Sequence, residues 1–163
     1  MFHFFVLLFL LSSCKEKQRY TRNSPEIETY KKVISDYVNR DWNDLSTHYA
    51  DSAKIMNNVT ENHAQNITDL ITTDKEDANS FSSWDYINEK YEMVVNDENE
   101  TWVYFNGIWK ATLSANQKVY EIPARINVRF VNGKIVREEG FWDLSRLMFD
   151  MIGQQQQDST LIN

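Results

Sequence analysis

The order of apolar and polar positions predicts helices in the first half of the chain. Ser-Pro-Glu at residues 24–26 is typical of a helix start, because serine caps well and proline suits the first turn. Apolar residues at helical spacing follow it, and similar spacing predicts helices over residues 42–50 and 60–73. Between these two we expect a short strand at residues 53–57, and after them a loop over residues 74–83.

The second half changes to the two-residue period of β-strands. Four strands are predicted, at residues 86–96, 101–113, 118–131 and 134–142. Asn132-Gly133 indicates a tight hairpin between the last two, since both residues tolerate positive φ. Helical spacing returns over residues 143–152, and a glutamine-rich tail at 154–163 is expected to be flexible. The fold class is therefore α+β, with one domain at residues 24–153.

The N-terminus has the features of a secretion signal. Residues 1–13 contain no Lys, Arg, Asp or Glu, and their apolar run is too short to span a bilayer. The Leu-Ser-Ser-Cys sequence that ends at Cys14 resembles the lipobox of bacterial lipoproteins. This resemblance implies acylation of Cys14 and anchoring in the cell envelope, on its periplasmic or surface side, with residues 14–23 as a tether. The alternative is an ordinary secretory signal followed by an incidental cysteine.

Composition narrows the possible partners. The chain has 163 residues and a formal charge of −7, so its field repels polyanions and disfavours nucleic acid as a partner. Cys14 is the only cysteine. If it is acylated, no thiol remains for a disulfide, and the fold depends on packing alone.

Three segments resemble the nuclear transport factor 2-like, or SnoaL-like, superfamily. They are the sequence YVNRDWNDL followed by YADSA within residues 37–53, NGKIV at 132–136, and FWD at 141–143 with leucines after it. The resemblance implies a cone: a strongly curved antiparallel sheet wrapped around N-terminal helices, with a pocket inside. The superfamily contains isomerases, cyclases, dehydratases and many non-catalytic binders, so the fold alone leaves the function open.

The resemblance also suggests where catalytic residues would lie. The general base of ketosteroid isomerases falls on Asn57 and their tyrosine donor falls near Val33, and neither side chain can perform those roles. The acid/base Asp of SnoaL-like cyclases matches Asp143. Asp143 is also well placed to cap the helix that follows, and we favour this structural role.

Aromatic residues are the best candidates for a ligand pocket. Trp42, Tyr49, Trp109 and Trp142 are predicted to line it, although such residues also fill cores and dimer faces. His48 and His63 lie in different predicted helices and no glycine-rich loop occurs, so neither a metal site nor a cofactor is expected. The alternation around Arg125 places it on the outer face of the sheet, where this fold commonly dimerises.

Two hypotheses follow from the sequence. The first is a lipid-anchored envelope protein whose domain binds a small molecule or a protein without catalysis. The second is a SnoaL-like isomerase or cyclase that uses Asp143 as general acid/base.

Overall fold

The computed structural model describes residues 19–161. The predicted signal peptide and the acylation site Cys14 lie outside this part of the chain. Within it, no helix is both long and apolar enough to cross a membrane.

The first two helices begin where their capping residues predict. In α1 (Pro25–Asn39), the Ser24 hydroxyl accepts a hydrogen bond of 3.2 Å from the Ile27 amide. In α2 (Trp42–Thr47), Asp41 caps the helix by accepting from the backbone of the first turn. One face of α1 is buried under the sheet; its buried residues are Ile27, Tyr30, Val33 and Ile34.

The strand that follows is longer than predicted. α2 ends at Thr47 rather than near residue 50, and β2 (Tyr49–Asn57) begins two residues later. The reason is tertiary: the His48 carbonyl accepts a hydrogen bond of 2.9 Å from the Ile135 amide, and β2 pairs with β6 from Tyr49 onward. Tyr49 therefore belongs to a strand, and its side chain is buried.

The prediction of a loop over residues 74–83 is wrong. Asn66 caps α3 (Ile67–Asp77) by accepting a hydrogen bond of 2.9 Å from the Asp69 amide. The helix therefore starts later than predicted and runs through the polar residues that suggested a loop. Short 3₁₀ turns flank it, at Glu61–His63 and Ala78–Ser80.

Within residues 19–161, six strands form one sheet in the order β1-β3-β4-β5-β6-β2. The central four run antiparallel to one another, and their bounds are β3 (Phe81–Val95), β4 (Thr101–Leu113), β5 (Val119–Val131) and β6 (Lys134–Trp142). The predicted hairpin joins the last two, with φ of 51° at Asn132 and 76° at Gly133. The sheet was predicted to be antiparallel, and it is so except at one edge, where β2 runs parallel to β6.

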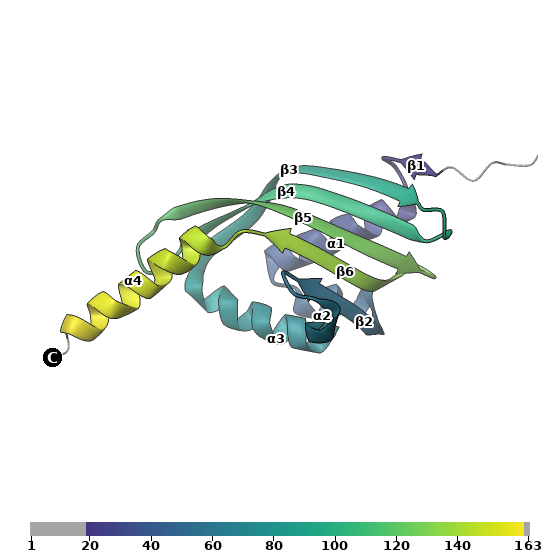
Figure 1. The fold of residues 1–163 in the computed structure, drawn as a ribbon. Helices are drawn as coiled ribbons and strands as arrows, with labels where there is room; N and C mark the ends of the chain where they lie inside the picture. Colours follow the sequence, from purple (N-terminus) through teal and green to yellow (C-terminus); the bar gives the residue numbers. More distant parts are fainter. Residues whose placement is uncertain (1–18, 162–163) are drawn as a thin grey trace, which may run out of the picture.

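The sheet curls over α1 and forms a cone (Figure 1). Strand β5 shows the alternation that this requires: Arg125 is exposed on the outer face, whereas the inward positions are buried, at Ile122, Ala124, Ile126, Val128 and Phe130. A homodimer through the outer face stays a prediction.

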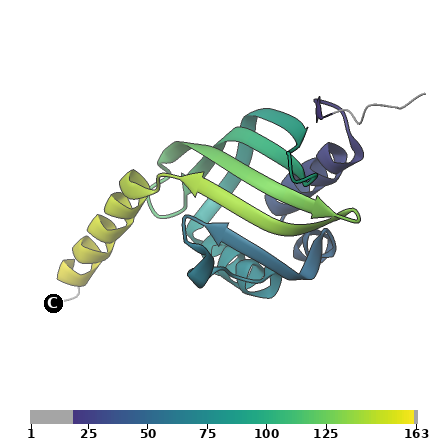
Figure 2. The same ribbon diagram turned by 45° about the vertical axis from the view of Figure 1, so that its right-hand side comes forward.

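Regular secondary structure occurs at both ends of the domain, within the segments predicted as tether and tail. Strand β1 (Tyr20–Thr21) joins the edge of the sheet beside β3, and Arg22 forms an ion pair of 3.0 Å with Glu92. At the other end, α4 (Ser145–Leu161) leaves the sheet and extends away from the body of the domain (Figure 2). The backbone predicted as a flexible tail is thus helical up to Leu161.

Candidate functional site

A cavity of about 510 Å³ lies inside the cone. It is enclosed by the concave face of the sheet, by α1 and α3, and by the first turns of α4. This volume is in the range of about 300–1,000 Å³ that is typical of small-molecule sites.

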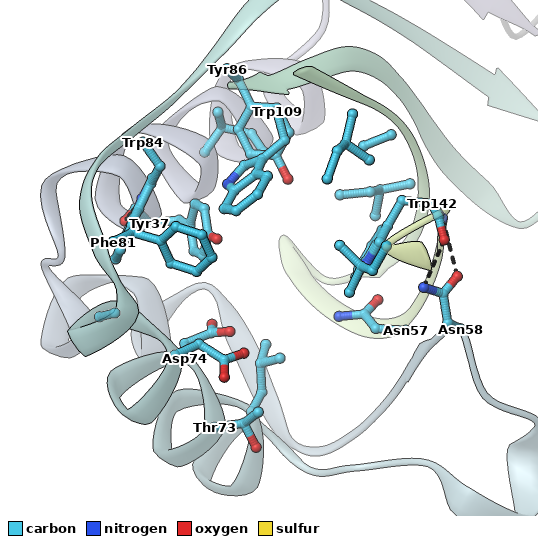
Figure 3. Close-up of a pocket in the computed structure, with 18 of the residues that line it drawn as sticks. Tyr37, Asn57, Asn58, Thr73, Asp74, Phe81, Trp84, Tyr86, Trp109 and Trp142 are labelled. Carbon is cyan, nitrogen blue, oxygen red and sulfur yellow. Dashed lines mark hydrogen bonds between the residues drawn. The ribbon is translucent and has the colours of Figure 1, made fainter. Parts of the chain in front are cut away.

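Aromatic rings form much of the cavity wall (Figure 3); the labelled ones are Tyr37, Phe81, Trp84, Tyr86, Trp109 and Trp142. They come from α1, from β3 and β4, and from the end of β6. Several contact one another: the ring centroids of Tyr37 and Trp84 lie 5.6 Å apart, and those of Phe81 and Trp109, which meet edge-on, lie 5.1 Å apart. Such contacts hold the rings in defined orientations and form a preorganised apolar surface.

A buried carboxylate, Glu138 on β6, also lines the cavity. Glu138 is only 4% exposed. Its carboxylate accepts hydrogen bonds from the Tyr49 hydroxyl at 2.5 Å and from the Asn57 side-chain amide at 3.2 Å. Burial raises the pKa of Glu138 above its ordinary value, while these two hydrogen bonds act in the opposite direction. Glu138 was not predicted from the sequence.

A second carboxylate, Asp74, projects from α3 toward the same cavity (Figure 3). Burial, followed by the charges of Glu138 and Asp77, raises the pKa of Asp74 to about 7. No described residue donates a hydrogen bond to its carboxyl group. Asp74 was also missed, because the sequence predicted a loop at this position.

Two buried polar atoms near the cavity have no hydrogen-bond partner among the described residues: Asn57 Oδ1 and the indole N–H of Trp109. Burial raises the pKa of the nearby Tyr37 hydroxyl, and the Trp109 indole acts in the opposite direction. Polar atoms in protein interiors are nearly always hydrogen bonded, so one acceptor and one donor here are available to a ligand.

No protein-family model and no curated protein sequence matches this chain. Solved structures do match its fold. A candidate polyketide cyclase from Xanthomonas campestris superposes with a TM-score of 0.65 at 12% identity, over 78% of this chain and 96% of that one. A nuclear transport factor 2-like protein of unknown function from Burkholderia pseudomallei superposes with a TM-score of 0.62 at 13% identity, over 77% and 96%.

The chain therefore has a nuclear transport factor 2-like fold. A candidate SnoaL-like polyketide cyclase from Shewanella putrefaciens shares this fold, with a TM-score of 0.60 at 16% identity over 81% of this chain and 88% of that one. At such low identity the similarity establishes the fold and leaves the chemistry to be argued from the site.

The nuclear transport factor 2-like domain brings three of the four predicted pocket residues together. Tyr49, Trp109 and Trp142 all line the cavity. Trp42 is not among its lining residues; it packs beside the cavity, with its ring 6.3 Å from that of Tyr37.

Asp143 also lies outside the cavity lining. Its side chain is exposed, and Oδ1 accepts a hydrogen bond of 2.9 Å from the Ser145 amide at the start of α4. Hydrogen bonds from the side chain and the backbone of Ser145 lower the pKa of Asp143. This geometry fits a residue that stabilises a helix start, whereas the carboxyl groups that line the cavity are those of Glu138, Asp74 and Asp77.

Proposed function

We propose that this protein is an envelope lipoprotein whose domain binds a small, ring-bearing molecule in the cone cavity without converting it. The observation that carries the proposal is the aromatic cavity of about 510 Å³. The unpartnered atoms of Asn57 and Trp109 support it, since a ligand that reaches them would satisfy both.

The position of β1 is compatible with an anchor at Cys14. Five residues separate Cys14 from Tyr20, so they reach at most roughly 20 Å. β1 and α4 lie at opposite ends of the domain (Figure 1), and α4 contributes Leu147 and Met151 to the cavity lining. An anchored domain would therefore hold its β1 end near the membrane and leave the α4 side of the cavity facing away from it.

Replacing Cys14 tests the anchor. Acyl chains on this cysteine contribute about 0.8 kcal/mol for each buried CH₂, so the lipidated protein should partition into detergent. The Cys14→Ala variant should stay in the aqueous phase or remain unprocessed. Ser13, its neighbour, offers a control: Ser13→Ala keeps a small residue before the cysteine and should partition like the parent protein. Equal partitioning of the Cys14→Ala variant would contradict the lipoprotein proposal.

Filling the cavity tests ligand binding. Ala124 is buried on β5 and lines the cavity, whereas its neighbour Arg125 is exposed on the outer face. In the mature chain with Cys14→Ala, which retains all described residues, we expect the neutral fluorophore N-phenyl-1-naphthylamine to bind. An Ala124→Leu change should weaken binding by about tenfold, because the added side chain occupies ligand space. Arg125→Leu should leave binding unchanged.

Circular dichroism would show that both variants are folded. If the Ala124→Leu and Arg125→Leu variants bind the fluorophore as the parent does, the probe is bound elsewhere and the cavity proposal fails.

One observation favours an enzyme as the second candidate. Asp74 and Glu138 face the same cavity, and both have raised pKa values, as acid/base groups often do. The proton-transfer group of an isomerase or cyclase would then be Asp74 rather than Asp143. A cavity ligand recovered unchanged after long incubation supports the binder. If the ligand is converted to a product, and the Asp74→Asn change abolishes this conversion, the enzyme is supported.

A further inference from the structure

The ionisable side chains that line the cavity include three carboxyl groups, those of Asp74, Asp77 and Glu138. Among the described lining residues there is no Lys, Arg or His to balance them. The cavity thus combines aromatic walls with acidic groups, and an anionic ligand would meet like charges at partly or fully buried positions.

The acidic groups have no cationic partner within the described part of the domain. Glu138 accepts hydrogen bonds only from the neutral donors Tyr49 and Asn57. Arg40, at the C-terminal end of α1, stacks on Trp84 at 4.2 Å and donates to the Phe81 carbonyl, and it does not line the cavity. A desolvated carboxylate without a counter-charge is unfavourable, and a cation that enters with the ligand would remove this penalty.

The aromatic walls favour the same kind of ligand. The faces of Trp and Tyr rings attract organic cations, and the attraction is stronger when the pair is desolvated. Trp109 and Tyr86 come from the sheet, and Tyr37 comes from α1 on another side of the cavity (Figure 3). Rings on several sides and carboxylates on α3 and β6 are the elements that a site for an organic ammonium group requires.

We infer that the ligand of this cavity is an organic cation: an apolar, ring-bearing body that carries an ammonium group, placed between Glu138 and Asp74. The inference rests on the proposed function, because it names the chemical class of the molecule that the cavity holds. Asn57 Oδ1, the unpartnered acceptor beside Glu138, is available for a further N–H donor of the ligand.

Three probes of equal length separate charge from shape: 3-phenylpropylammonium, 3-phenyl-1-propanol and 3-phenylpropionate. Binding to the mature Cys14→Ala chain is measured by calorimetry and by shifts of the Trp109 and Trp142 indole signals in NMR spectra. At pH 8 the ammonium probe should bind about tenfold more tightly than the alcohol, and the carboxylate most weakly. Equal affinities for ammonium and alcohol, or a preference for the carboxylate, would overturn the inference.

Isosteric variants test the two carboxylates. Glu138→Gln and Asp74→Asn should each remove most of the preference for the ammonium probe and leave the affinity for the alcohol nearly unchanged. Asp69→Asn is the matched control. Asp69 lies on α3, the helix that carries Asp74, but it is exposed and does not line the cavity. If the ammonium preference survives in both cavity variants, the cation does not bind between these groups.

The pH dependence gives a readout that a structural role alone would not produce. Asp74 faces Glu138 on β6, Asp77 on its own helix, and the hydroxyls of Tyr37, Tyr49 and Tyr86. Ammonium binding should strengthen as the pH rises from 6 to 8 and should release protons, whereas alcohol binding should not. If none of the probes binds, the small-molecule proposal itself fails; if all bind without discrimination, only the charge inference fails.

Discussion

The Asp74→Asn variant should be more stable than the parent protein at pH 8 and equally stable at pH 4. In the folded protein the pKa of Asp74 is raised from 3.8 to about 7, chiefly by burial. The carboxyl group is thus protonated at a higher pH in the folded chain than in the unfolded one. Its contribution favours folding below pH 4 and is progressively lost as the pH rises toward 7.

A pKa difference of about 3 corresponds to about 4 kcal/mol. Because Asp74 keeps part of its surface in contact with solvent, we expect the substitution to raise the free energy of unfolding at pH 8 by about 2 to 4 kcal/mol. Urea denaturation at both pH values measures this difference. Asp69→Asn removes a carboxylate from an exposed position of the same helix and should leave the pH dependence unchanged. The free energy of unfolding of the parent should fall, relative to that of Asp74→Asn, between pH 4 and pH 8. If it does not, Asp74 is not desolvated.

The sequence predicted those elements whose signals are local. The start of α1 follows from the cap at Ser24, and the β5–β6 hairpin follows from two residues that accept positive φ. The alternation of β5 correctly placed Arg125 on the outer face. In each case the residue type and its immediate neighbours determine the backbone, so one sequence is sufficient.

The two cavity carboxylates could not be found in this way. Strict alternation along β6 from the buried Ile135 would place Arg137 inside the cone. The pairing of β5 with β6 instead shifts register after Arg129, and this buries Glu138. The shift depends on how the two strands pair, so it cannot be recognised in the sequence of either strand alone. Asp74 was missed for a local reason, since the polar run around it outweighed the cap at Asn66 that fixes the phase of α3.

Three of the predicted pocket residues, Tyr49, Trp109 and Trp142, line the cavity. Trp42 was predicted on the same grounds, but α2 directs it against Tyr37 beside the cavity. The composition thus indicated an aromatic pocket, whereas its charge depended on tertiary structure.

Gly140→Ala should be strongly destabilising, because this position of β6 has no space for a side chain. A Cβ atom there would overlap Asn57 Oδ1 and would lie 2.9 Å from Cη2 of Trp142, within a buried part of the sheet. Asn57 cannot yield without weakening its hydrogen bond to Glu138, and Trp142 cannot yield without reshaping the cavity wall. Overpacking of this kind costs about 1–3 kcal/mol and occasionally more.

We expect a loss of about 3 kcal/mol, which for a chain of this length lowers Tm by roughly 10 °C. Gly153→Ala is the matched control: a Cβ atom at this exposed position of α4 meets nothing within 4 Å, and alanine favours helix over glycine. Its Tm should equal that of the parent or slightly exceed it. The Gly140→Ala variant should also lose affinity for the cavity probes, since Asn57 and Trp142 are both displaced. The opposite result is a Gly140→Ala protein that melts like the parent and binds the probes equally well. That result would show that β2 and the end of β6 lie farther apart than the hydrogen bond between Asn57 and Glu138 requires.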